Sequence, residues 1–90
     1  SKTEVLTAIK DESLSFTSDY KGGFSIFALG GDAHGVYEKD CEYELSDYNL
    51  QSASSLGVSN SFCGKETEIS VEDGKLLIIF TRQGEYKIGF

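Results

Sequence analysis

The chain has 90 residues, of which 39% are hydrophobic, and its 15 acidic and 8 basic side chains give a formal net charge of −7. This length fits one compact domain over residues 1–90 and leaves no room for a second core. The negative charge repels phosphate backbones and anionic lipid surfaces, so we expect no nucleic-acid partner and no membrane partner. The sequence also shows no apolar run of the kind found in signal peptides or membrane-spanning helices.

The N-terminal third predicts three strands. Residues 4–10 fit either one face of a helix or a strand that pairs with residues 14–17, and we favour the strand. Leu14 and Phe16 alternate with serines, which indicates a second strand. Residues 24–29 form an apolar run between two glycine pairs, a pattern typical of a short buried strand.

The middle of the chain predicts an acidic strand followed by a loop. Four carboxylates alternate there with Cys41, Tyr43 and Leu45; they are Glu38, Asp40, Glu42 and Glu44. This alternation predicts a strand with its acidic face in solvent and Cys41 inside. Alternate side chains lie about 7 Å apart, too far to share one cation, so we expect no metal site. Residues 46–64 lack alternation and indicate a loop, with a short helix over 47–56 as the alternative.

The C-terminal third predicts a hairpin and a final strand. Residues 66–71 alternate, and Asp73-Gly74 is the typical signal of a two-residue type I′ turn. Residues 75–81 are apolar on both faces, which predicts a strand at the centre of the sheet. Residues 86–90 alternate again, and we expect them to pair beside that central strand.

The two cysteines predict a disulfide. With a single histidine and no CxxC pair, the chain lacks the ligands of a structural zinc site. A bond between Cys41 and Cys63 would add about 3 kcal/mol to the stability of a small domain. Because disulfides persist in oxidising compartments, we predict a secreted, extracellular protein.

These elements predict an all-β fold, a small antiparallel sandwich or barrel of about six to seven strands with one disulfide. Residues 46–51, 56–60 and 69–74 resemble the second half of a βγ-crystallin Greek-key motif. The resemblance implies Greek-key connectivity. In that family a loop with paired Asn or Asp residues and a nearby Ser binds calcium, whereas residues 59–62 here supply only Asn60 of such a pair.

No group of residues in the sequence indicates catalysis. His34 is the one histidine, it falls in a glycine-rich stretch, and no second residue completes a general-base or nucleophile pair. We therefore predict no enzyme and no cofactor. By elimination, the interpretation is a small secreted interaction module of the effector kind, which contacts a protein partner through strand edges, loops and the tyrosines Tyr20, Tyr37 and Tyr48. The alternative is a calcium- or ligand-binding Greek-key domain.

Overall fold

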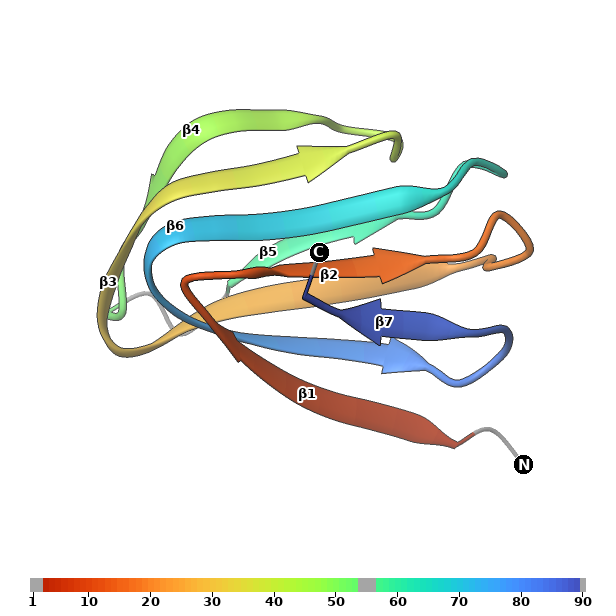
Figure 1. Cartoon of the computed structure of the whole chain (residues 1–90), viewed down its shortest axis with the longest axis horizontal. Coiled ribbons are helices and arrows are strands. Elements are labelled where there is room, and N and C mark those ends of the chain that lie inside the picture. Colours follow the sequence, from red (N-terminus) through yellow and green to blue (C-terminus); the bar gives the residue numbers. More distant parts are fainter. Residues whose placement is uncertain (1–2, 54–56, 90) are drawn as a thin grey trace.

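The computed structural model describes residues 3–53 and 57–89, which form seven strands and no helix. In chain order the strands are β1 (Glu4–Lys10), β2 (Ser13–Phe16), β3 (Gly23–Lys39), β4 (Leu45–Leu50), β5 (Val58–Ser61), β6 (Thr67–Thr81) and β7 (Tyr86–Ile88). Every pairing is antiparallel, and all seven strands belong to one sheet (Figure 1). The all-β prediction and the strand over residues 4–10 are therefore confirmed. With no helix in the described ranges, no helical membrane span occurs there.

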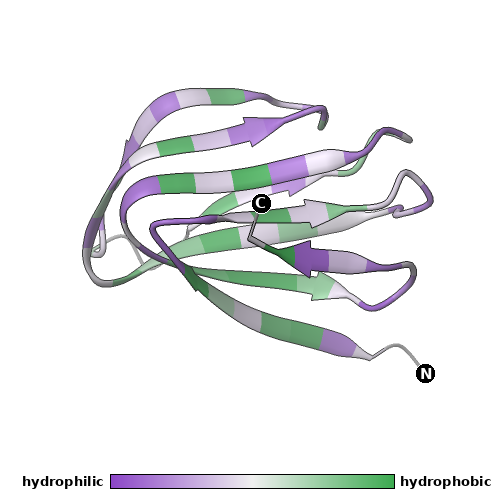
Figure 2. Cartoon of the chain, viewed as in Figure 1, coloured by the Kyte–Doolittle hydropathy of each residue, from purple (hydrophilic) through white to green (hydrophobic). Residues whose placement is uncertain are grey.

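The two long strands β3 and β6 pair with each other and bend together, so that the sheet folds over onto itself (Figure 1). One half of the sheet has the order β5-β3-β6-β1, and the other has the order β4-β3-β6-β2-β7. The two halves face each other, which agrees with a small sandwich. Figure 2 shows hydrophobic residues alternating with polar ones along the first half of β6, whereas the half after the bend is hydrophobic on both faces.

The dipeptide Asp73-Gly74 forms the bend of β6 and not a hairpin turn, so the hairpin prediction is wrong. Residues on either side of it pair with different strands, since β2 takes residues 67–70 and β1 takes residues 75–81. Asp11, between β1 and β2, holds this bend: its carboxylate accepts a hydrogen bond from the Gly74 amide (2.9 Å) and its own amide donates to the Gly74 carbonyl (3.1 Å). A Cβ on Gly74 would lie 2.9 Å from the Ala33 Cα, which explains why glycine occupies the bend.

The central position of residues 75–81 is confirmed, because this part of β6 lies between β1 and β3. Leu76, Ile78 and Phe80 are buried, whereas Leu77 and Ile79 are half-buried on the outer face. An aromatic cluster forms part of the core, and the centroids of its neighbouring rings are 4.7 to 6.4 Å apart. Its members are Phe16, Tyr20, Phe24, Phe62 and Phe80. Tyr20 is only 1% exposed, and its hydroxyl donates to the Gly84 carbonyl (2.9 Å).

Several predicted boundaries are wrong because strand pairing continues through them. Gly30 and Gly31 do not end a short strand, since they lie within the 17-residue β3. His34 is exposed on β3 opposite Asp73, and so is not in a loop. The final strand β7 pairs with β2 instead of β6, and Phe90 lies outside the described residues.

The middle segment also differs from its prediction. The strand β3 ends at Lys39, so residues 40–44 form a loop and not the second half of an acidic strand. Glu38, predicted to face solvent, is buried. Residues 45–50 form β4, where a loop or a helix was expected, and residues 54–56 of that expected helix lie outside the described residues.

The two cysteines are not bonded, so the predicted Cys41–Cys63 disulfide is wrong. Cys41 lies opposite Phe62 in an isolated bridge, and both side chains are buried. Successive side chains of an extended segment point to opposite faces, so Cys63 is exposed. Its thiol donates to the Asp40 carbonyl (3.2 Å) instead. The inward position predicted for Cys41 is confirmed.

Free thiols give a direct test. We expect denatured, unreduced protein to take up two alkyl groups by mass spectrometry, because neither sulfur is bonded. A reductant should leave the melting midpoint unchanged, since no crosslink restricts the unfolded chain. An unalkylated mass, or a midpoint that falls with reductant, would contradict the structure.

Candidate functional site

The most connected polar group in the described residues is the side chain of Asn60, which is buried on β5. Its Oδ1 accepts hydrogen bonds from the backbone amides of Tyr43 (3.0 Å) and Ser61 (2.8 Å). Its Nδ2 lies 2.6 Å from the Tyr43 carbonyl, 3.0 Å from the Glu38 Oε1 and 3.4 Å from the Cys41 Sγ. One side chain therefore joins β5, the end of β3 and the loop of residues 40–44.

The Asn60 side chain holds both backbone polar groups of Tyr43, whose ring nevertheless faces solvent. Tyr43 is 65% exposed, the most exposed large hydrophobic side chain in the described part of the chain. Two further hydrogen bonds order the loop: the Asp40 amide donates to the Glu44 Oε2 (2.8 Å), and the Glu42 amide donates to the Ser61 carbonyl (3.0 Å). We call Tyr43, with the flanking carboxylates Glu42 and Glu44, the Tyr43 platform.

The electrostatics of the Tyr43 platform are negative. Glu42 raises the pKa of the Tyr43 hydroxyl through a hydrogen bond and through its charge, so the phenol stays neutral at physiological pH. The exposed ring face of Tyr43 beside the Glu42 carboxylate can attract a cation, because the ring face is electron-rich and the carboxylate adds charge. The platform suits a flat, positively charged organic ligand.

Beneath the platform lies the buried carboxyl group of Glu38, which is 0% exposed. Burial raises its pKa to about 7, an effect that the hydrogen bond from Asn60 partly opposes. Burial, followed by the charge of Glu38, raises the pKa of the Cys41 thiol to about 11. Cys41 is therefore a thiol and not a thiolate at neutral pH, which argues against a nucleophilic role.

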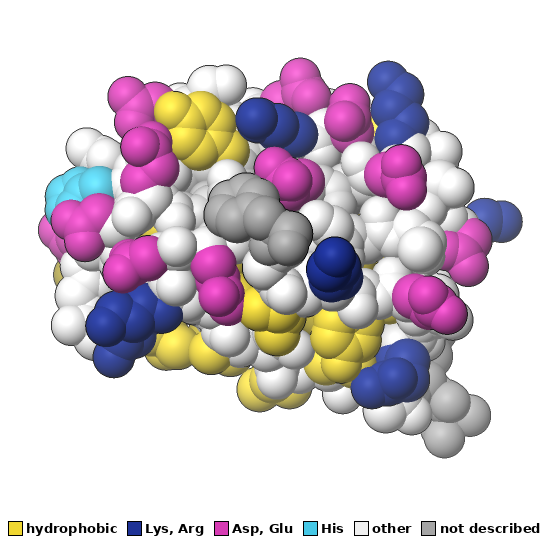
Figure 3. Space-filling model, in the orientation of Figure 1, with side chains coloured by type: hydrophobic (Ala, Val, Ile, Leu, Met, Phe, Trp, Pro, Cys, Tyr) yellow, Lys and Arg dark blue, Asp and Glu magenta, His cyan; other side chains and the backbone are white. Residues whose placement is uncertain are grey.

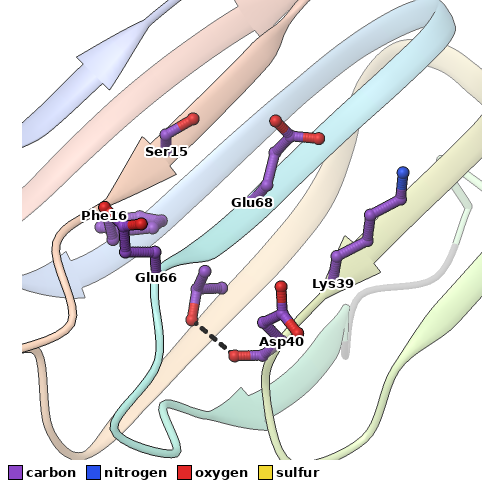
Figure 4. A pocket seen from close by; sticks show the side chains of 7 residues that line it. Ser15, Phe16, Lys39, Asp40, Glu66 and Glu68 are labelled. Carbon is purple, nitrogen blue, oxygen red and sulfur yellow. Dashed lines mark hydrogen bonds between the residues drawn. The ribbon is translucent and has the colours of Figure 1, made fainter.

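A separate pocket of about 360 Å³ opens where β2, β3 and β6 meet (Figure 4). Its lining comprises Ser15, Phe16, Lys39, Asp40, Glu66, Thr67 and Glu68. The Thr67 hydroxyl donates to the Asp40 carbonyl (3.0 Å), which fixes the start of the loop of residues 40–44. Figure 4 shows the carboxylates of Glu66 and Glu68 on one side and Lys39 on the other. The pocket is a second candidate site, with weaker organisation than the platform.

The structure does not bring the predicted contact tyrosines together. Tyr20 belongs to the core and offers no surface. Tyr37 is half-buried on β3, with the Lys39 ammonium 5.5 Å from its ring centroid. Tyr48 is 42% exposed on β4. No group of three or more histidine, cysteine or acidic side chains among the described residues could hold a metal ion.

The residues that organise the site were missed by the sequence interpretation, although one signal for them exists. Val58, Asn60 and Phe62 share one parity, and an amide at an inward position between apolar residues indicates a buried polar contact. No comparable signal marks Glu38 or Tyr43. An acidic residue in an alternating acidic stretch is normally on the surface.

Solved structures share this fold. The crystal structure of thiamine pyrophosphokinase from Bacillus subtilis is 18% identical, covers 89% of the chain and superposes with a TM-score of 0.76. Thiamin pyrophosphokinase from Geobacillus thermodenitrificans is also 18% identical, covers 89% of the chain and has a TM-score of 0.75. The chain spans 38% of the length of each of these proteins. A comparison with curated proteins gives no match.

A family model described as thiamin pyrophosphokinase, vitamin B1 binding domain, matches residues 10–76. This match and the shared fold overturn the predictions of a secreted, extracellular effector-like module and of a βγ-crystallin-like calcium-binding domain. The prediction of a non-enzyme is also wrong, because the matching family model describes a domain of an enzyme. Since the matched segment spans more than half of the sequence, the chain belongs to the family of thiamin pyrophosphokinase vitamin B1 binding domains.

Proposed function

We propose that this domain binds thiamin on the Tyr43 platform, as the vitamin-holding part of an enzyme that transfers a pyrophosphoryl group to thiamin. The observation that carries the proposal is the family match over residues 10–76, which includes both the loop of residues 40–44 and Asn60. The described side chains offer no arrangement that would itself transfer phosphate. We therefore assign binding and orientation, and no bond-making step, to this domain.

The chemistry of thiamin fits the Tyr43 platform. Thiamin carries a positively charged thiazolium ring and a flat aminopyrimidine ring. The face of Tyr43 can stack on either ring, and the carboxylates of Glu42 and Glu44 offset the positive charge. Acidic side chains also outnumber basic ones on the face of the molecule in Figure 3, in keeping with the net charge of −7, and such a surface draws in a cation.

The anchoring of Tyr43 supports affinity as well as position. Asn60 binds the amide and the carbonyl of Tyr43, so this part of the loop is ordered before a ligand arrives. Ordering a loop on binding would cost conformational entropy, and an organised platform avoids much of that cost. The arrangement is that of a preformed site supported by buried polar contacts.

Thiamin titrated calorimetrically into the folded 90-residue chain tests the proposal. We expect Tyr43→Ala to weaken binding roughly 3- to 30-fold, the range that a cation held over an aromatic ring supplies. Tyr48→Ala is the matched control, because it removes an exposed tyrosine from β4 and should leave the affinity unchanged.

Two results would contradict the placement or the function. If Glu66→Gln and Glu68→Gln abolish binding while Tyr43→Ala does not, thiamin occupies the pocket of Figure 4 instead of the platform. If the folded chain shows no heat of binding at millimolar thiamin, the proposed function of this chain is wrong.

A further inference from the structure

Glu38 occupies a position in the fold where an apolar residue is expected. It follows the buried Val36 on the inner face of β3, and its pairing partners are Leu45 on β4 and Ile69 on β6. Its Oε1 accepts the hydrogen bond from Asn60, whereas its Oε2 is buried and has no partner. Among the described contacts, no basic side chain reaches it. A carboxyl group this buried and this poorly paired costs stability, which calls for an explanation beyond packing.

Glu38, Tyr43 and Cys41 share the two hydrogens of one amide group. The Asn60 Nδ2 carries two hydrogens and faces three acceptors: the Tyr43 carbonyl, the Glu38 Oε1 and the Cys41 Sγ. A neutral carboxyl group is a weaker acceptor than a carboxylate, so it leaves the amide to Tyr43. A carboxylate draws the amide towards itself. The unpaired Oε2 of a charged Glu38 would also need a water molecule as its hydrogen-bond donor. Water could reach it only if the surrounding residues, among them the loop of residues 40–44 and Asn60, moved aside.

We propose that Glu38 is a positioning residue for the Tyr43 platform: the loop of residues 40–44 holds Tyr43 firmly while Glu38 keeps its proton, and this loop loosens when Glu38 loses it. The consequence for ligand binding rests on the proposed function: thiamin binds more weakly on the alkaline side of neutrality than on the acidic side.

Glu38 titrates in the pH range in which this loosening of the loop would matter. Burial raises its pKa to about 7, above the value of 4.5 of an unperturbed glutamate. An acid whose pKa is raised by folding binds more protons in the folded state than in the unfolded state between these two values. The stability of the protein therefore falls as the pH rises from 4.5 to about 7, and then stays level with respect to this group.

The other titratable groups around Glu38 do not replace it. Cys41 is the nearest other titratable group, and the charges that act on it come from Glu38, from Glu44 in the same loop and from Cys63 after β5. The pKa of Cys41 is raised to about 11, so this thiol stays neutral throughout. The partners on β4, β5 and β6, namely Leu45, Asn60 and Ile69, do not titrate. His34 lies on β3 opposite Asp73, away from this cluster, and its replacement supplies the control.

The test compares wild type, Glu38→Gln and the control His34→Gln between pH 5.5 and 8.5. Hydrogen exchange of the Tyr43 amide, divided by its intrinsic rate, reports the loop without any ligand. Calorimetry with thiamin reports the site. In wild type and His34→Gln we expect Tyr43 protection and thiamin affinity to fall together, by about threefold or more, with one inflection near pH 7. In Glu38→Gln both profiles should be flat, because the amide carries no titrating proton.

Each outcome separates the inference from the proposed function. If Tyr43 protection follows Glu38 but thiamin does not bind, the inference stands and the proposed function fails. If thiamin binds with the same pH profile in wild type and Glu38→Gln, the function stands and the inference is overturned. If Glu38→Gln does not fold, the pH titration of the Glu38 carboxyl ¹³C shift in wild type decides. A midpoint near the ordinary glutamate pKa of 4.5 overturns the inference, and so does a Tyr43 amide whose protection does not change across the Glu38 titration.

Discussion

We expect Ile78→Ala to lower the free energy of unfolding by about 2–5 kcal/mol, the cost of emptying a fully buried aliphatic site. Ile78 is 0% exposed on the central part of β6, where it lies between Thr7 of β1 and Ile26 of β3. The strands on both sides belong to the same folded sheet, so the cavity cannot close by a local shift. Urea denaturation followed by circular dichroism measures the change. A loss of this size is a large fraction of the total stability of a small domain.

Two variants calibrate this result. Ile79→Ala removes the same atoms from the outer, half-buried face of β6, so its cost should be roughly half that of Ile78→Ala. Glu68→Ala, on the same strand, should cost less than about 0.5 kcal/mol. If Ile78→Ala and Ile79→Ala lose equal stability, the facing of β6 described here is incorrect.

We expect Asn60→Ala to cost about 2–4 kcal/mol, because it leaves several polar groups without their partner. The amides of Tyr43 and Ser61 lose an acceptor, and the Tyr43 carbonyl and Glu38 lose a donor. The loop of residues 40–44 should loosen as well, with faster hydrogen exchange at Tyr43. Ser59→Ala, at an exposed neighbouring position on β5, is the control and should change stability by less than about 0.5 kcal/mol.

Asn60→Asp distinguishes the donor from the acceptor role of the side chain. A carboxylate still accepts from the Tyr43 and Ser61 amides but cannot donate to Glu38, and it places a second acid beside it. Two carboxyl groups this close cannot both ionise without a large cost in free energy. Relative to wild type, this variant should therefore lose more stability at pH 8 than at pH 6. Equal urea midpoints at the two pH values would show that Glu38 and residue 60 do not interact.

Local patterns in the sequence were sufficient for the strands whose two faces differ clearly. Residues 13–16 follow from alternation, and a buried strand over residues 75–81 follows from its apolar content, but the choice of Ile78 over Ile79 as the inward residue does not. The signal at Asp73-Gly74 was also local and was misleading. A type I′ turn competes there with a bend, and the bend wins because β1 and β2 together supply more pairing partners than a hairpin would.

The candidate site was harder to predict because its members meet through the tertiary fold. Glu38 and Asn60 lie 3.0 Å apart but 22 positions apart in sequence, and neither residue alone indicates the contact. The alternating acids suggested one strand facing solvent, yet β3 ends at Lys39 and the chain turns, so Glu38 and Glu42 have opposite environments. The cysteines misled the interpretation further, because their spacing says nothing of the face on which each thiol lies.

An all-β domain with one central apolar strand follows from composition and from the alternation of side chains, since both are properties of short segments. The choice of strand partners, the bend shared by β3 and β6, the buried state of Glu38 and the exposure of Tyr43 came only from the tertiary structure. These features depend on contacts between distant residues. The free energy of such contacts is decided by which surfaces the whole chain can bury at once, and no short segment of sequence carries that information.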